Sequence, residues 1–529
     1  MGVNMAQVTG QSAGNPGGSG GSLHKGISLL PMVILGVGGA VGTGALFSGI
    51  GMAAIAGPAM IVSWVIGCVI YTFIGITYVD MSVRFPEAGG PARYSLYTHG
   101  WVANLINSVG SLVWYLLIPP IEAIATVTAL SYFDSGLLNA KGDPTLSGAL
   151  VALALLIVYI PVNFYGVKIM ARINNVLGGI KIVLYLLLAI AFIIAIGKVH
   201  NFSAFGGFAP YGIGPIFAAV PVAMFAFGAI RVIPDFAEEA NNARTLRVGI
   251  LYTLGVQFLV YVLFSVALIA GLSWGVLSVK VGDWSALTAV TANPFIALTT
   301  NRGVDWLLAI AVAVGILGPG VAGYVYQGAG ARVVLAMART GYVPERLKEI
   351  HARHRTPGLS LIIVAVIGAA LALLAAPVPR IISLIDDAVV GGYISFGIVP
   401  AAMLAVRKQR GEKLSAGALI IGALGFGGAS LVVYWSGWPA VPYAVILVAI
   451  GSVLLGVSGR WKDIGHALWY IVWILFLLGM AAIGSVGRGT EISFNLSSVI
   501  VAVVSIFVIL PWAVQSRMAR DAYPVESES

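Results

Sequence analysis

The chain of 529 residues is 59% hydrophobic and only 9% charged, with a formal net charge of +9. Apolar stretches of about 17 residues or more recur along its whole length, which excludes a soluble protein and predicts an all-α integral membrane protein that lies in a lipid bilayer. A β-barrel is excluded because no region alternates apolar and polar residues over about ten positions.

Fourteen apolar segments have the length of membrane-spanning helices. In chain order they cover residues 29–50, 60–79, 105–130, 148–164, 176–196, 216–233, 248–270, 306–330, 359–376, 389–406, 416–435, 441–457, 467–483 and 496–512. We predict two repeats of five spans, followed by four further spans. The predicted units are a flexible cytoplasmic tail (1–24), a first inverted repeat (25–210), a second inverted repeat (211–410), four C-terminal spans (411–516) and a cytoplasmic tail (517–529).

The positive charge is distributed unevenly over the connections between these segments. With the N-terminus inside, 21 of the 29 Lys and Arg residues fall on the cytoplasmic side and 6 on the outer side. The positive-inside rule therefore predicts a multi-pass protein of the cell membrane with both termini in the cytoplasm. This distribution explains the net positive charge, so we predict no nucleic-acid partner. The two remaining cations, Lys181 and Arg231, fall inside apolar segments.

The first segment is interrupted by a glycine-rich run over residues 36–44, which ends in Gly42, Thr43 and Gly44. Glycine disfavours helix interiors, and unwound backbone at membrane depth is stable only where it is buried in protein or lines a cavity. One interpretation is close helix packing through Gly38 and Gly42. The other is a ligand site in a broken helix.

The glycine run does not form a nucleotide loop. After Gly36 and Gly38, a dinucleotide fingerprint requires a third glycine at the position of Val41. The sequence contains no Walker A motif and no His-Glu-x-x-His zinc motif, and Cys68 is its single cysteine, so we predict no cofactor and no metal site. These absences favour transport driven by gradients over an enzyme or an ATP-driven pump.

Glu122 in the third segment and Lys181 in the fifth are further candidate residues. Glu122 follows two prolines and either pairs with a buried cation or carries a proton. Lys181 also has two interpretations. It either snorkels to the cytoplasmic interface, or it is a fixed ammonium that replaces a sodium ion by bonding the unwound carbonyls of the first segment.

The sixth segment is predicted to be a second broken helix, because Gly228 and Pro234 interrupt its hydrogen bonding. Segments one and six are equivalent positions in two five-helix halves, and paired interruptions of this kind indicate an inverted-repeat transporter. Arg231 lies between the two interruptions. Its permanently charged guanidinium suits a carboxylate ligand, and the alternative is an ion pair with Asp235 at i+4 or with Glu122.

Two other pairs of residues receive structural interpretations. Asp386 and Asp387, at the start of the tenth segment, are interpreted as interfacial residues rather than coupling residues. Trp274 and Trp284 lie in the long outer connection between segments seven and eight, where they belong either to an interfacial aromatic belt or to a lid.

Several motifs resemble the amino acid-polyamine-organocation superfamily of permeases. Val-Gly-Thr-Gly-Ala-Leu at 41–46 is similar to its Ile-Gly-Ser-Gly-Ile-Phe motif in segment one. Phe-Ala-Phe-Gly at 225–228, followed by Glu-Glu-Ala-Asn-Asn at 238–242, resembles its sixth-segment pattern, with Ala243 in place of the usual proline. Within the superfamily, the sequence most resembles the aspartate/proton symporter branch, for example in Phe-Ala-Pro-Tyr-Gly at 208–212.

The resemblance implies a LeuT-like 5+5 inverted-repeat fold with about fourteen transmembrane helices, and it implies a substrate site. The substrate carboxylate would be held by the backbone of Val41, Gly42, Thr43 and Gly44. The amino-group side and an aromatic gate would be formed by Phe225, Ala226, Phe227 and Gly228. Lys181 matches the fifth-segment lysine of sodium-independent members, and Glu122 is a second proton-coupling candidate. Arg231 departs from the superfamily and argues against cationic amino acids.

We therefore predict a secondary active amino acid transporter, a proton-coupled symporter that favours an acidic amino acid because Arg231 can bind a side-chain carboxylate. Its expected partners are an amino acid, a proton and the lipid bilayer; the sequence does not define an oligomeric state. The alternatives within transport are an exchanger, a neutral amino acid permease or a cation permease of the same fold. A non-transporting membrane sensor or assembly subunit is the alternative from another class.

Overall fold

The computed structural model describes residues 23–290, 292–300, 302–377, 387, 389–457, 461–486 and 491–519. Within this part of the chain the regular structure is helical, and β-pairing is limited to isolated bridges. Eleven helices are long and apolar enough to cross a membrane, and three shorter apolar helices accompany them. Of the predicted tails (1–24 and 517–529), residues 1–22 and 520–529 lie outside the described residues, as does Asp386.

Each of the fourteen predicted segments coincides with helical structure, which confirms the all-α membrane fold. The number of helices that cross the membrane stays a prediction. The first five segments form Leu29–Ala40 (α1), Thr43–Ala56 (α2), Met60–Arg84 (α3), Leu96–Leu130 (α4), Leu146–Phe164 (α5) and Val167–Ile196 (α6). α4 begins earlier than predicted and is kinked at Gly100, whose φ of 79° glycine adopts readily.

Within the described residues, the next five segments and their connections form eight α-helices. They are Gly214–Ala218 (α7), Val220–Phe227 (α8), Val232–Asp235 (α9), Ala243–Gly271 (α10), Pro294–Thr299 (α11), Asp305–Thr340 (α12), Gly358–Leu374 (α13) and Val390–Gln409 (α15). Segment six is the most divided, because a 3-10 turn over Gly228–Arg231 separates α8 from α9. The predicted break in this segment is thereby confirmed.

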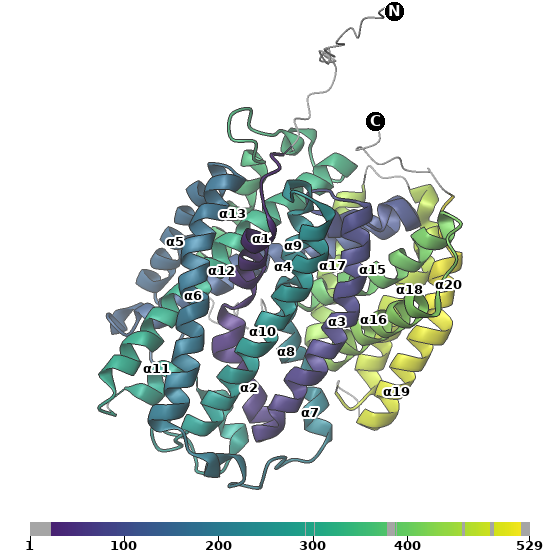
Figure 1. Cartoon of the computed structure of the whole chain (residues 1–529). Coiled ribbons are helices and arrows are strands. Elements are labelled where there is room, and N and C mark those ends of the chain that lie inside the picture. Colours follow the sequence, from purple (N-terminus) through teal and green to yellow (C-terminus); the bar gives the residue numbers. More distant parts are fainter. Residues whose placement is uncertain are drawn as a thin grey trace, which may run out of the picture.

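The last four segments gather on one side of the bundle, next to α3 and α15 (Figure 1). They form Ala416–Trp435 (α16), Ala440–Gly456 (α17), Ile464–Ile483 (α18), Phe494–Val504 (α19) and Leu510–Gln515 (α20). A π-helical turn over Ser505–Ile509 joins α19 to α20. α16 packs against both α3 and α15, so this group is attached to the helices of the first ten segments.

Helices that lie five segments apart pack against one another: α2 with α8, α3 with α10, α4 with α12, and α5 with α13. Two five-helix repeats related by a pseudo-two-fold axis produce this pairing. Small residues permit the closest approaches between helices. A Cβ added to Gly110 of α4 would lie 2.7 Å from the carbonyl oxygen of Gly391 in α15. The repeat boundaries near residues 210 and 410 stay a prediction.

Trp274 and Trp284 are buried in the outer connection, with exposed fractions of 5% and 1%. Their rings lie 5.0 Å apart, and Trp284 Nε1 donates a hydrogen bond to Phe205 O at 2.9 Å. The turn that begins at Trp284 packs against α2. The aromatic-belt interpretation is therefore wrong, because both indoles pack inside the protein over the end of a broken helix.

Candidate substrate site

The break in the first helix is shorter than its glycine run. α1 continues to Ala40, and only Val41 and Gly42 separate it from Thr43, the first residue of α2. A Cβ at Gly42 would lie 2.6 Å and 2.7 Å from the carboxylate oxygens of Glu122. This close approach favours glycine at position 42.

Glu122 of α4 caps the N-terminus of α2. Its Oε2 accepts hydrogen bonds from Thr43 N at 3.0 Å and from Thr43 Oγ1 at 2.7 Å. The side chain is 3% exposed, so it meets the partial positive charge of the helix terminus in a buried setting. In this conformation the Glu122 carboxylate therefore binds Thr43, a residue whose backbone the family resemblance assigns to the substrate carboxylate.

Lys181 lies in the middle of α6 and is completely buried. Its Nζ donates hydrogen bonds to Gly38 O of α1 at 2.7 Å and to Gly318 O of α12 at 2.8 Å. A lysine that snorkels to the interface exposes its ammonium to water, so the snorkelling interpretation is wrong. The ammonium instead connects α1, the first half of the broken first helix, to α12 of the second predicted repeat.

The break in the sixth helix is bordered by aromatic side chains. Trp114 of α4 packs so closely on Gly228 that a Cβ there would overlap its indole ring. The ring of Phe225 lies 6.1 Å from that of Trp114, and Phe225 is partly exposed. Phe227 is completely buried, with its ring 5.7 Å from Tyr71. Phe225 therefore borders the break, whereas Phe227 fixes α8 against the neighbouring helices.

Tyr261 of α10 connects the two broken helices. Its hydroxyl lies 2.9 Å from Ala40 O and 2.7 Å from Ala226 O, and the side chain is completely buried. The two breaks also touch directly, because a Cβ on Gly44 would lie 2.8 Å from Ala226 Cα. The ends of α1 and α8 and the start of α2 thus meet at one point.

Sequence reasoning did not single out Tyr261, although a signal was present. Thr253 lies two helical turns earlier on the same face of α10, and its side chain contacts α1 at Gly36. Polar residues at this spacing in an apolar helix mark a face that packs on other protein rather than on lipid. The spacing of polar residues in α10 thus indicated which face of the helix packs on protein. Only the fold shows that Tyr261 on this face contacts the carbonyls of Ala40 and Ala226.

Arg231 has a buried guanidinium whose hydrogen-bond partners are neutral. Nη2 donates to Ser111 Oγ at 2.5 Å, and Nη1 donates to Ser395 Oγ at 2.9 Å and to Gly392 O at 3.3 Å. Its Nε has no hydrogen-bond partner. The guanidinium also lies over the ring of Phe396, 5.0 Å from its centroid, which adds a cation–π contact.

Neither of the two carboxylates proposed as partners of Arg231 forms an ion pair with it. Asp235 accepts a hydrogen bond from the hydroxyl of Tyr115, and Glu122 caps α2. Among the described residues Arg231 forms no ion pair at all. Neither acid therefore forms a direct ion pair with Arg231 in this conformation, although the charge of Asp235 still interacts with the guanidinium.

The two glutamates after helix six form ion pairs with arginines of α12. Arg332 of α12 donates to both carboxylate oxygens of Glu239, at 2.5 Å and 2.7 Å. Glu238 binds Arg339 at 2.6 Å and accepts a hydrogen bond from the backbone N of Leu23 at 3.0 Å. Burial raises the pKa of Glu238, but the hydrogen bond and charge of Arg339 outweigh it and hold the pKa below its ordinary value. These pairs join the end of helix six to α12 and to the N-terminal segment.

A bundle of apolar helices with two adjacent broken helices and buried charges at the breaks defines a multi-pass membrane transporter. The chain belongs to the amino acid permease family, which matches residues 27–445. It is therefore a transmembrane amino acid transporter and not an enzyme.

Proteins with transport functions are similar to the chain over most of its length. It is 27% identical over 530 residues to the glutamate/serine transporter AimA of Bacillus subtilis (strain 168), covering 96% of this chain and 97% of the relative. It is 27% identical over 519 residues to the aspartate-proton symporter of the same organism, covering 95% and 98%. It is 26% identical over 457 residues to the branched-chain amino acid permease BcaP, again from that organism, covering 83% and 94%.

Proposed function

We propose that this permease is a proton-coupled symporter that favours acidic amino acids. The observation that carries the substrate preference is Arg231, a buried guanidinium at the break in helix six with no ion-pair partner in the described part of the chain. A buried charge without a counter-ion is costly, and a ligand carboxylate supplies the counter-ion. The names of two relatives, a glutamate/serine transporter and an aspartate-proton symporter, support the same preference.

The two breaks suggest how the substrate binds. Its α-carboxylate is assigned to the N-terminus of α2 at Thr43, where Glu122 now supplies a carboxylate of the same charge. Its amino group is assigned to the break at 225–228, beneath Phe225 and Trp114. The side-chain carboxylate of aspartate or glutamate is then directed toward Arg231.

Competition for Thr43 supplies a physical link between proton and substrate. The Glu122 carboxylate holds the amide and hydroxyl of Thr43. When Glu122 takes up a proton it loses the charge that stabilises this contact, and the two donors become available to a substrate carboxylate. Proton binding and substrate binding then favour each other. Lys181 is the second candidate for coupling, since its buried ammonium bonds carbonyls of both halves.

A neutral amino acid permease is the second candidate function. The observation that favours it is the set of three neutral hydrogen-bond acceptors around Arg231, which satisfy part of the guanidinium without a substrate. The relative named as a branched-chain amino acid permease points in the same direction. In that case Arg231 is a structural residue between α4, helix six and α15.

Competition in proteoliposomes separates the two candidates. Uptake of radiolabelled glutamate is measured with unlabelled acidic, neutral and basic amino acids as competitors. We expect acidic amino acids to compete best and Arg231→Ala to weaken acidic substrates by about tenfold or more while neutral ones change little. Thermal unfolding in detergent checks that the variant is folded. An equal loss for acidic and neutral substrates assigns Arg231 to structure and contradicts the acidic preference.

A further inference from the structure

A cavity of about 480 Å³ lies away from the two breaks, at the end of the bundle where α3 and α15 end and α16 begins. Its walls come from α3, α10, α15 and α16. The inner wall is apolar and includes Val79, Val83 and Ile421. Three arginines line the remainder: Arg84, Arg247 and Arg407. The cavity therefore combines an apolar wall with positive charge.

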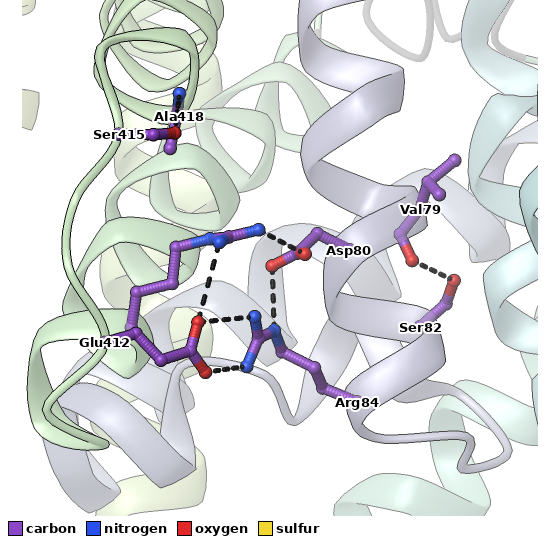
Figure 2. A network of polar contacts seen from close by, with 8 residues as sticks. Val79, Asp80, Ser82, Arg84, Glu412, Ser415 and Ala418 are labelled. Carbon is purple, nitrogen blue, oxygen red and sulfur yellow. Dashed lines mark hydrogen bonds and ion pairs between the residues drawn. The ribbon is translucent and has the colours of Figure 1, made fainter.

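Asp80, which lines the cavity, and Glu412, which binds two of its arginines, are already neutralised (Figure 2). Arg84 donates to Asp80 at 2.9 Å and to both oxygens of Glu412 at 2.6 Å and 2.9 Å. Arg407 donates to Asp80 at 2.6 Å and lies 3.5 Å from Glu412. Each carboxylate thus faces two guanidinium groups, and two arginines balance two acids. The third arginine leaves a positive charge in excess.

Two guanidinium groups retain donors for a ligand. Arg247 has an exposed side chain and forms no hydrogen bond or ion pair within the described part of the chain. Arg407 Nε is buried and has no hydrogen-bond partner. Guanidinium donors of this kind match the oxygens of a phosphate group. The excess charge and the unused donors therefore lie in the same cavity.

The cavity lies at the end of an outward-facing apolar stripe. Residues seven apart in a helix share a face, and on α3 this relation connects Val62, Val69, Ile76 and Val83. Val62 and Val69 are 37% and 51% exposed, and Ile76 and Val83 line the cavity. On α10, Leu251 lies one turn beyond Arg247 and is 48% exposed. A molecule bound in this cavity would therefore contact the arginines at one end and the exposed apolar residues of α3 at the other.

We propose that this cavity binds the phosphate of an anionic phospholipid, with Arg247 and Arg407 as donors and the acyl chains along the apolar stripe of α3. The required ligand has one phosphate charge and a long apolar part, and a phospholipid has both. Juxtamembrane arginines attract anionic lipids. The arginines lie on the side that we predict to be cytoplasmic, so the lipid belongs to the inner leaflet.

Lipid binding to the purified full chain tests this site independently of transport. Fluorescent phosphatidylglycerol is titrated into delipidated protein in detergent, with phosphatidylcholine as the zwitterionic comparison. We expect phosphatidylglycerol to bind more tightly, and Arg247→Gln to weaken it about fivefold. Arg244→Gln is the matched control, because Arg244 is also exposed on α10 and does not line the cavity. It should change the affinity less than twofold.

Three outcomes overturn the proposal. Equal binding of the two lipids shows that no anionic site is present. Equal losses for Arg247→Gln and Arg244→Gln show that the attraction is a general surface effect. Inorganic phosphate that binds as tightly as phosphatidylglycerol, and displaces it, assigns the cavity to a soluble phosphate compound. Because Arg247 is exposed and unpaired, its replacement should leave the thermal unfolding temperature unchanged, which confirms that the variant is folded.

Discussion

Glu122 is the residue on which the coupling account depends. It is buried, it holds the first residue of α2 through two hydrogen bonds, and it belongs to a helix of the same repeat. A carboxylate that stabilises a helix N-terminus loses this interaction when it is protonated. In the proposed mechanism, the binding of a proton to Glu122 therefore releases a pair of donors at the proposed substrate site.

Glu122→Gln should separate exchange from accumulation. Like protonated Glu122, the glutamine lacks the charge that stabilises the contact with Thr43, so the donors of Thr43 stay available to the substrate, but the side chain no longer takes up a proton. We expect exchange of internal for external substrate to continue, while accumulation driven by a pH gradient falls by at least about fivefold. Both rates are measured in the same proteoliposomes. Accumulation that still follows the pH gradient in this variant would show that Glu122 is not the coupling residue.

The partners of the buried cations mark the limit of residue-level prediction. The sequence identified Lys181 and Arg231 because charges inside apolar segments are costly and require partners. It predicted carbonyls of the first segment for Lys181, and Gly38 lies in that segment. It did not identify the other partners, since Gly318 is 137 positions from Lys181 and Ser111 is 120 positions from Arg231. Local patterns contain no information about contacts at this separation, which arise only when helices pack.

At the scale of single elements, the broken first helix is the feature that defines the site. The glycine run predicted the break, but the structure keeps residues up to Ala40 helical. Packing explains the difference. Gly36 lies against Thr253, and Gly38 lies against Asn174, so these glycines permit close helix contacts without unwinding. Only Val41 and Gly42 leave the helix, so close packing accounts for the first part of the run and the break is confined to its end.

Gly42→Ala should disable the break without removing any polar group. The new methyl group would come within 2.6 Å of Glu122 and 2.8 Å of Ala322, so the cap on α2 must shift. We expect a loss of about 1–3 kcal/mol in the free energy of unfolding and a loss of transport. Uptake assays and thermal unfolding measure the two effects.

The matched control for Gly42→Ala is Gly51→Ala in α2, the helix that begins after Gly42. A Cβ at Gly51 meets no atom within 4 Å, and alanine favours a helix interior over glycine by about 0.5–1 kcal/mol. This variant should keep transport and gain slightly in stability. Equal effects of the two substitutions would show that the contact between Gly42 and Glu122 has no special role.

At the scale of the whole molecule, charged pairs join helices that belong to different groups. Arg84 and Asp80 of α3 meet Arg407 of α15 and Glu412 in the connection to α16. This network links the first repeat, the second repeat and the C-terminal group of helices. The sequence placed these charges at helix ends through the positive-inside pattern. Their pairing depends on the tertiary fold and was not predicted.

The network predicts an acid-sensitive contribution to stability. The hydrogen bond from Arg84, together with the charges of Arg84 and Arg407, holds the pKa of Glu412 below its ordinary value. The stabilisation is therefore present above the pKa of the unfolded chain and is lost as pH falls through the lower folded pKa. Since Glu412 is 34% exposed, solvent screening limits the effect of Glu412→Gln at neutral pH to about 0.5 kcal/mol.

Thermal unfolding as a function of pH measures this contribution. The difference between the wild type and Glu412→Gln should be present at neutral pH and vanish in acid. Glu345→Gln is the control, because Glu345 is 80% exposed and pairs with Lys348 within one turn of the same segment. It should have a smaller effect. A constant difference between the wild type and Glu412→Gln at all pH values would contradict the assigned ionisation.

The central claim is that this amino acid permease couples the entry of an acidic substrate to a proton. The most direct measurement is the uptake of radiolabelled aspartate or glutamate into proteoliposomes with an acidic exterior, in the absence of sodium and of internal substrate. The account predicts accumulation above the external concentration that collapses when a protonophore removes the gradient. Uptake that ignores the pH gradient and appears only with internal amino acid would contradict symport and identify an exchanger.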